Sequence, residues 1–170
     1  MVRLRPYKPS DAWHLLKWWE GVSEKEFIKW SAGKFQYPLT IEQLDTYFSE
    51  WCLQRDDGWL MTALDTAGEP SGHFILRLVD YEAGTARIGF IVINPKLRGR
   101  GLGKEMVCQA LCYAFGLLGL KRVSLGVFVN NKRAMACYEA AGFIQKEYVP
   151  EYMKYNGEAY GVYEMEAKRI

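Results

Sequence analysis

The stretch Arg98-Gly99-Arg100-Gly101-Leu102-Gly103-Lys104 lies between a strand-like run and an apolar helix. Its glycines let the backbone approach a ligand closely and adopt positive φ angles. The helix that follows adds unpaired backbone N–H groups and the positive end of its dipole, which together favour phosphate. The stretch therefore predicts a phosphate-binding loop, and the plainer alternative is a tight strand-to-helix turn with two solvated arginines.

Two familiar nucleotide-binding loops do not fit this stretch. A Walker A loop needs a glycine before its Gly-Lys pair and a Ser or Thr after it, where this chain has Arg98 and Glu105. The dinucleotide fingerprint would need a glycine at Lys104 or at Met106, according to the glycine from which it is counted. Both classes are excluded.

Strand-like runs precede the glycine-rich stretch, and a helix and a strand follow it. Short turn sequences separate Trp59–Leu64, Ser71–Val79 and Ala86–Ile93, which predicts an antiparallel three-strand meander. Apolar residues at helical spacing continue to Leu118, and the β-branched run Val123–Val129 predicts a further strand. The step from Ala86 to Val129 therefore indicates one parallel crossover.

The two ends of the chain complete the pattern. A strand at Val2–Pro6, helices after Pro9 and near Glu24–Trp30, and a capping box at Thr40 and Gln43 are expected. The helix behind that box has an apolar stripe of Leu44, Tyr47, Phe48, Trp51 and Cys52. A helix from Asn130-Asn131 to Gly142 and the strands Phe143–Val149 and Ala159–Ala167 close the chain. The fold class predicted is α+β, with a mixed, mostly antiparallel, six- to seven-stranded twisted sheet flanked by helices on both faces.

Length and composition exclude several classes of protein. The chain has 170 residues, 49% of them hydrophobic and 25% charged, which favours one domain over 1–170 rather than a disordered, collagen-like or coiled-coil chain. The apolar runs are shorter than the ~20 residues of a membrane span, and the opening Met1-Val2-Arg3-Leu4-Arg5 is unlike a secretory signal, so we expect neither. The four cysteines lack zinc-ligand spacing and only two histidines occur, so we expect no metal, no membrane and a cytoplasmic location.

Charge is segregated along the chain, although the net charge is only +2. Residues 20–57 hold eight acids and four bases, whereas residues 87–133 hold nine bases and one acid. A basic centre in a near-neutral chain predicts an anionic ligand held locally. It does not indicate a nucleic-acid partner, which usually requires a basic domain throughout.

Two blocks of sequence match a known pattern. The first, Arg98-x-x-Gly101-x-Gly103, fits the loop Q/R-x-x-G-x-G/A, and the second is Asn131-x-x-Ala134-x-x-x-Tyr138-x-x-x-Gly142-Phe143. On these blocks the chain resembles the GNAT superfamily of acyl-CoA-dependent N-acetyltransferases. The order of predicted elements extends the resemblance over the whole chain, as one acyl-CoA N-acyltransferase domain with a GNAT-like fold. The opening Arg5-Pro6-Tyr7 with Asp11 and the late tyrosine-rich strands are similar to the branch of ribosomal-protein N-terminal acetyltransferases.

The resemblance implies acetyl-CoA as cosubstrate. Its pyrophosphate would rest on the backbone amides of the glycine-rich stretch, and its pantetheine arm would pair like an added strand with the backbone of Ile91 and Ile93, which can still pack in the core. Asn131 would cap its helix, contact the cofactor, or do both. The cofactor-binding residues implied are Ile91, Ile93, Arg98, Gly99, Arg100, Gly101, Leu102, Gly103, Lys104 and Asn131.

Tyr138 is the catalytic residue that the resemblance implies, and a half-buried core tyrosine is the alternative. Its hydroxyl would protonate the departing thiolate, a contribution of roughly 10²–10⁴-fold, after direct attack of a neutral amine on the thioester in a ternary complex. The usual positions of a base carboxylate hold Arg87 and Gly126. The proton acceptor is therefore expected to be ordered water or a group elsewhere, such as His73 or Glu151.

The acceptor groove implied by the resemblance lies between the early helices and the last strands. Carboxylates and aromatic rings there suit a cationic small amine or a protein N-terminus, although core packing is the alternative for the aromatics and is favoured for Trp13, Trp51 and Trp59. The missing base carboxylates also leave open a catalytically weak acyl-CoA-binding sensor or scaffold. Exposed aromatic strands near the C-terminus are compatible with a homodimer.

Overall fold

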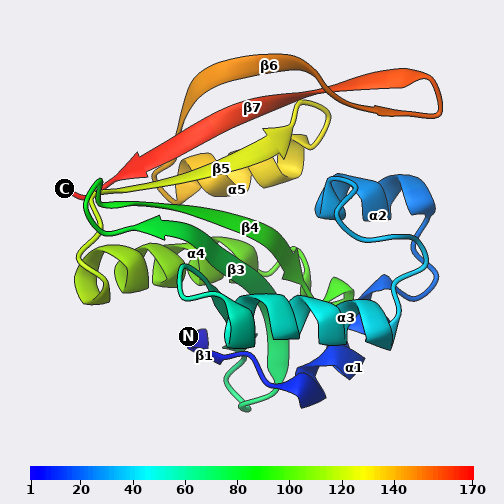
Figure 1. The fold of residues 1–170 in the computed structure, drawn as a ribbon, viewed down its shortest axis with the longest axis horizontal. Helices are drawn as coiled ribbons and strands as arrows, with labels where there is room; N and C mark the ends of the chain where they lie inside the picture. The colour runs from blue at the N-terminus through cyan, green and yellow to red at the C-terminus, as the bar shows by residue number, and fades with distance from the viewer.

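A computed structural model describes residues 1–170 and contains one seven-stranded sheet (Figure 1). The strand order is β1-β2-β3-β4-β5-β7-β6, and every neighbouring pair is antiparallel except β4 and β5. This confirms the mixed, mostly antiparallel sheet and the single parallel crossover that the sequence predicts. The strands are β1 (Arg3–Pro6), β2 (Trp59–Leu64), β3 (Pro70–Asp80), β4 (Thr85–Ile93), β5 (Arg122–Phe128), β6 (Ile144–Tyr155) and β7 (Glu158–Lys168).

Helices cover both faces of the sheet, and each face has its own core. The core on the side of α4 and α5 includes Phe74, Met106 and Leu125, whereas the core on the other side is rich in aromatic residues from α1, α2 and α3. No helix is long and apolar enough to cross a bilayer. The helices are α1 (Ala12–Trp19), α2 (Glu24–Ser31), α3 (Ile41–Phe48), α4 (Leu102–Cys112) and α5 (Lys132–Ala140); α3 and α4 continue into π-helical turns at Ser49–Gln54 and Tyr113–Leu117.

Two sequence predictions of buried side chains in the first half of the chain need correction. Trp13 does not pack in the core: it is 62% exposed, because Ala12, Leu15 and Trp18 form the buried face of α1 and Trp13 points away from it. Cys52 is also exposed rather than part of an apolar stripe. Trp51 is buried as predicted, and Trp59 is half-buried against the core.

The capping box predicted ahead of α3 forms only in part. The Thr40 hydroxyl accepts a hydrogen bond from the Gln43 backbone N–H at 3.3 Å, which is the expected N-cap. The Gln43 side-chain amide, however, donates to the carbonyls of Gln36 and Pro38 instead of accepting from the Thr40 backbone. Gln43 therefore fixes the loop that leads into the helix.

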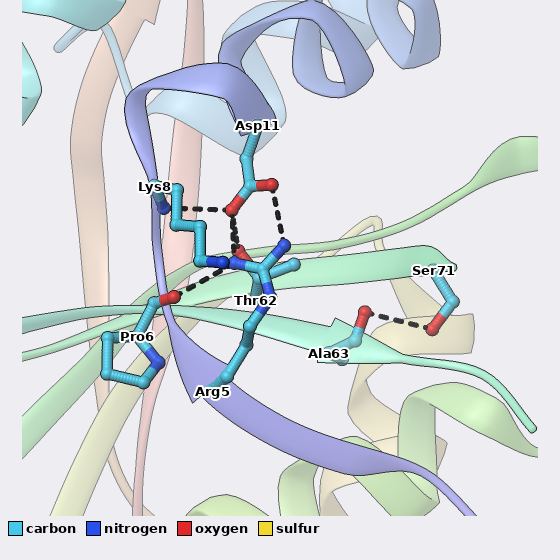
Figure 2. Close-up of polar contacts among 7 residues, drawn as sticks. All are labelled: Arg5, Pro6, Lys8, Asp11, Thr62, Ala63 and Ser71. Carbon is cyan, nitrogen blue, oxygen red and sulfur yellow. Dashed lines mark hydrogen bonds and ion pairs between the residues drawn. The ribbon is translucent and has the colours of Figure 1, made fainter. Parts of the chain in front are cut away.

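A buried carboxylate joins the start of the chain to the sheet (Figure 2). Asp11 is 4% exposed and accepts hydrogen bonds from Arg5 Nη1 and Nη2 at 2.6 and 2.8 Å, from the Lys8 backbone N–H at 2.9 Å and from the Thr62 hydroxyl at 2.7 Å. Burial acts to raise the pKa of Asp11, but these hydrogen bonds outweigh it and hold that pKa below its usual range. Arg5 and Asp11 thus anchor the first helix to β1 and β2.

Candidate functional site

A β-bulge interrupts β4 near its middle. His73 pairs with Val92, and Ile75 pairs with Gly89. An advance of two residues along β3 therefore corresponds to three residues along β4, which leaves one extra residue in β4. Phe90, within the bulge, has a φ of +48°, a backbone conformation that is strained for any residue other than glycine. Such strain is commonly found at functional sites. The bulge also changes which face of the sheet the later side chains of β4 occupy.

Beyond the middle of β4, the strands β4 and β5 separate (Figure 1). Their parallel pairing extends only from Thr85 with Arg122 to Arg87 with Ser124. A cleft of about 760 Å³ opens from there, lined by residues 88–93 of β4 and 125–128 of β5. Unpaired backbone groups along such an opening can accept an extended ligand as if it were another strand.

The glycine-rich stretch lines this cleft where α4 begins. Gly99 and Gly101 have φ angles of +82° and +80°, which turn the chain sharply into α4 at a position where only glycine is unstrained. A Cβ on Gly101 would meet no atom within 4 Å, so the backbone there faces open space. The loop therefore presents the N-terminus of α4 to the cleft, an arrangement suited to an anion.

Arginines add positive charge beside this loop. Arg98 donates from Nε to the Ile93 carbonyl at 3.3 Å, and burial together with the nearby Arg133 lowers the pKa of Arg98. Arg133 was not predicted as a site residue, yet it lines the cleft and its guanidinium lies 3.8 Å from where a Cβ on Gly99 would be. Its place in the basic segment 87–133 was the available signal.

The structure brings most of the predicted cofactor-binding residues together. Arg100 is the exception, because it does not line the cleft. The side chains of Trp19, Val22 and Trp30, from α1 and the region of α2, form a further wall that sequence analysis did not assign. The predicted residues that line the cleft are Ile91, Ile93, Arg98, Gly99, Gly101, Leu102, Gly103, Lys104, Asn131 and Tyr138.

The α5 side of the cleft carries Asn131 and Tyr138. Asn131 caps the helix, since its Oδ1 accepts from the Ala134 backbone N–H at 3.2 Å. Tyr138 is 9% exposed, and burial, with a smaller effect of Cys137, raises the pKa of its hydroxyl well above the ordinary value. The hydroxyl therefore stays protonated through the neutral pH range and is available as a proton donor.

An ion pair lies at the closed end of the cleft. Arg87 of β4 donates to both carboxylate oxygens of Glu164 of β7, at 2.6 and 2.8 Å. The pair passes over Gly126 of β5, where a Cβ would be 2.8 Å from Arg87 Nη2 and 3.2 Å from Glu164 Oε1. Sequence analysis missed Glu164, which is 77 positions from its partner. Its carboxylate therefore occupies the space that a side chain at Gly126 would need.

His73 and Glu151, the two other candidates for a general base, do not line the cleft. His73 is buried under the helices, its Nε2 is 3.1 Å from the Tyr47 hydroxyl, and burial lowers the pKa of His73 to about 3. Glu151 is exposed and pairs with Lys154 at 3.7 Å. No three His, Cys, Asp or Glu side chains are placed to hold a metal ion.

Comparison with known proteins identifies the family. The family model described as the acetyltransferase (GNAT) family matches residues 24–143. A mycothiol acetyltransferase of Salinispora tropica is 31% identical over 153 residues, covering 84% of this chain and 44% of that protein. A spermidine N(1)-acetyltransferase of Vibrio cholerae is 34% identical over 67 residues, covering 39% of each chain. The matched region thus covers less than half the length of each of these curated relatives.

A solved structure supports the fold. The crystal structure of spermidine N-acetyltransferase from Vibrio cholerae in complex with CoA and spermine superposes with a TM-score of 0.83 and 21% identity, covering 98% of this chain and 95% of that chain. None of these comparisons singles out the ribosomal-protein branch, which stays a prediction. The family match covers most of the chain, and the element order and the cleft agree with it. The chain belongs to the GNAT family of acetyltransferases.

Proposed function

We propose that residues 1–170 form an acyl-CoA N-acyltransferase domain that transfers the acetyl group of acetyl-CoA to a primary amine. The observation that carries this proposal is the cleft between β4 and β5, at which the two sequence blocks meet. Gly101 and Gly103 come from the first block, and Asn131 and Tyr138 from the second. A structural turn alone would not require all four to face one cavity.

The residues present fit acetyl-CoA. The left-handed backbone at Gly99 and Gly101 exposes loop amides, and Arg98, Lys104 and Arg133 supply positive charge for a pyrophosphate. Beyond the loop, the backbone of β4 up to Ile93 is free of β5 and can pair with an extended amide-bearing arm. We therefore expect the cofactor to lie along β4 with its phosphates on the loop.

Bound acetyl-CoA would supply an acetyl thioester that a neutral amine can attack directly. The chain's own part is to hold and move protons. Tyr138 keeps its phenolic proton because burial raises its pKa, so it can donate that proton to a departing thiolate. We expect a backbone N–H near Ile91–Ile93, just beyond the bulge at Phe90, to polarise the thioester carbonyl.

The proton released by the amine needs an acceptor. The base positions expected from the family are Arg87 and Gly126, and the nearest carboxylate to both is Glu164. Arg87 holds the Glu164 carboxylate through two hydrogen bonds. We therefore expect Glu164 to accept the proton of the amine through an ordered water molecule rather than by direct contact. We propose that protein, cofactor and amine form a ternary complex, as the family resemblance implies, and that the amine attacks the thioester directly.

We expect the acceptor to enter the cleft beside α2, which contributes Glu26, Lys29 and Trp30 to its lining. Lys25 of α2 pairs with Glu158 at 3.7 Å and lies over the ring of Tyr160, so the end of the β6–β7 hairpin contacts α2. The relatives named above are a mycothiol acetyltransferase and a spermidine N(1)-acetyltransferase. A protein N-terminus is the acceptor that the similarity to the ribosomal-protein branch implies. The acceptor that we propose is a primary amine, a class that includes both polyamines and protein N-termini.

A thiol-release assay tests the proposal. Acetyl-CoA and the purified chain would be incubated with small amines, polyamines and short peptides that have free N-termini, and released CoA thiol would be measured. Amine-dependent release above the uncatalysed rate supports the proposed function. Binding of acetyl-CoA without thiol release in the presence of any of the amines contradicts it and favours the second candidate, an acyl-CoA-binding sensor or scaffold. The absence of a carboxylate at positions 87 and 126, which hold Arg87 and Gly126, is the observation that favours this candidate.

Self-association is a further expectation. The outer strand β6 is exposed along most of its length, with Tyr148 52% and Tyr152 45% exposed. A spermidine N-acetyltransferase from Vibrio cholerae with a similar fold has been solved as a dodecamer. We expect this chain to form at least a homodimer, which sedimentation equilibrium would detect.

A further inference from the structure

Arg77 is a half-buried cation next to the acceptor side of the cleft. It lies on β3 directly opposite Arg87 of β4, so two arginines face each other across one strand pair. Its guanidinium carbon is 5.9 Å from the centre of the Phe90 ring, and its Nε is 3.6 Å from where a Cβ on Gly89 would be. Both Phe90 and Gly89 line the cleft, so Arg77 stands immediately behind its wall.

The charge of Arg77 is not balanced by the protein. Arg87 has Glu164 as its partner, whereas the Arg77 Nε is buried without any hydrogen-bond partner. Burial and then Arg87 lower the pKa of Arg77, and no carboxylate forms an ion pair with it. Like charges placed opposite one another in a sheet are destabilising unless something offsets them.

Two further donors near Phe90 lack acceptors. The indole N–H groups of Trp19 and Trp30 are buried without a hydrogen-bond partner, and both tryptophans line the cleft. Trp30 packs against Phe90 with ring centres 5.7 Å apart. Because a buried donor without an acceptor costs free energy, this side of the site has a surplus of donors that a ligand could satisfy.

A second cavity, of about 560 Å³, gives Arg77 room for a ligand group. It lies between α3 and the end of β3, and its charged lining residues are Arg77, Lys34, Arg55, Glu42 and Glu50. Arg55 pairs with Asp57 at 2.8 Å, and neither Glu42 nor Glu50 forms an ion pair with Arg77. Phe90 lines this cavity and also the cleft. The cleft and this cavity therefore adjoin at Phe90.

We propose that Arg77 binds an anionic group of the acceptor, so that the preferred acceptor is an amine that also carries a carboxylate. The inference rests on the proposed acetyl transfer and names its substrate class. A carboxylate brings only hydrogen-bond acceptors and matches a guanidinium in two-point geometry. A polyamine brings only donors and positive charge, which is the opposite of what Arg77, Trp19 and Trp30 require.

Matched pairs of acceptors test the proposal. Lysine and cadaverine differ only by the carboxylate, as do phenylalanine and phenethylamine, and spermidine serves as the polyamine. We expect kcat/KM for the carboxylated member to exceed that of its partner by roughly ten- to a hundred-fold, as charge-assisted hydrogen bonds allow. Equal rates within a pair, or a preference for cadaverine or spermidine, would overturn the proposal while leaving the acetyltransferase function intact.

Variants assign the effect to Arg77. Arg77→Gln should bring the ratio within each pair close to one, and Arg77→Lys should retain part of it. Arg122→Gln removes a charge from an exposed position at the start of β5 and should leave the ratio unchanged. A ratio that survives in Arg77→Gln refutes the role of Arg77; if this variant does not fold by circular dichroism, the wild-type ratios and Arg77→Lys decide.

A binding experiment separates failure of this proposal from failure of the proposed function. If no amine is acetylated, calorimetry of lysine and of cadaverine with the wild-type chain still tests the carboxylate site. Binding of lysine that is at least ten-fold tighter than that of cadaverine, and that is lost in Arg77→Gln, supports the anion site in a chain without turnover. Absence of any such difference overturns it.

Discussion

Replacing Asp11 by alanine removes one carboxylate and leaves four hydrogen-bond donors without their acceptor. These are two guanidinium nitrogens of Arg5, the Lys8 backbone N–H and the Thr62 hydroxyl (Figure 2). Breaking a buried ion pair by removing one partner costs about 3–5 kcal/mol. The Arg5 side chain is 24% exposed, so water compensates it in part and the lower end, about 3 kcal/mol, is expected.

Urea unfolding followed by tryptophan fluorescence measures this loss. For a chain of this size, 1 kcal/mol corresponds to roughly 2–4 °C in Tm, so Asp11→Ala should also melt about 6–12 °C lower. Thr62→Val is the matched control, because it removes one of the four donors and should cost only about 1 kcal/mol. A loss below 1 kcal/mol in Asp11→Ala would refute the view that this carboxylate anchors the first helix to the sheet.

The pH dependence of the free energy of unfolding gives a second, independent test of the role of Asp11. Its pKa in the folded chain lies below the unfolded value of about 3.9, so its contribution is fully present above that value and disappears as the pH falls through the folded pKa. The difference in stability between wild type and Asp11→Ala should therefore be constant near neutral pH and shrink below about pH 4. A difference that grows in acid would contradict the assigned hydrogen bonds.

Three further changes address the site itself. Tyr138→Phe should lower kcat by roughly 10²–10⁴-fold with little change in acetyl-CoA binding, and an unchanged kcat across pH would reject its acid role. Gly101→Ala meets no neighbour, but its φ of +80° should cost about 1–2 kcal/mol and weaken acetyl-CoA binding measured by calorimetry. Asn131→Ala should lose about 1 kcal/mol of stability in urea because the cap on Ala134 N–H disappears; unaltered stability would show that the cap is dispensable.

Local pattern accounts for most of what could be predicted. Helical spacing and caps place α2, α3 and α5 within a few residues, because the signals for a helix lie within the helix and its first turn. The glycines at positions 99 and 101 indicate a ligand loop because positive φ is a property of the residue itself. The last two strands were predicted too short, since Ile144–Tyr155 is exposed and lacks the apolar alternation that marks a strand.

Contacts between distant residues account for what was missed. Trp13 was assigned to the core on residue type, but only its place on the outer face of α1 decides its exposure. Glu164 could not be linked to Arg87 without knowing that β7 lies next to β5 rather than next to β6 alone. The unbalanced charge of Arg77 likewise depends on the register that puts it opposite Arg87.

The Arg87–Glu164 ion pair explains why this chain has an arginine at position 87 and a glycine at position 126, the two positions where a base carboxylate is expected. Backbone pairing between β4 and β5 ends at Arg87 and Ser124, so the strands need another connection where the cleft begins. The ion pair supplies it by joining β4 to β7 across β5, where Gly126 has no side chain in its path. A side chain at position 126 would have to displace the two paired groups, so the arginine at position 87 and the glycine at position 126 suit each other, and the pair brings a carboxylate of β7 to the point where β4 and β5 separate.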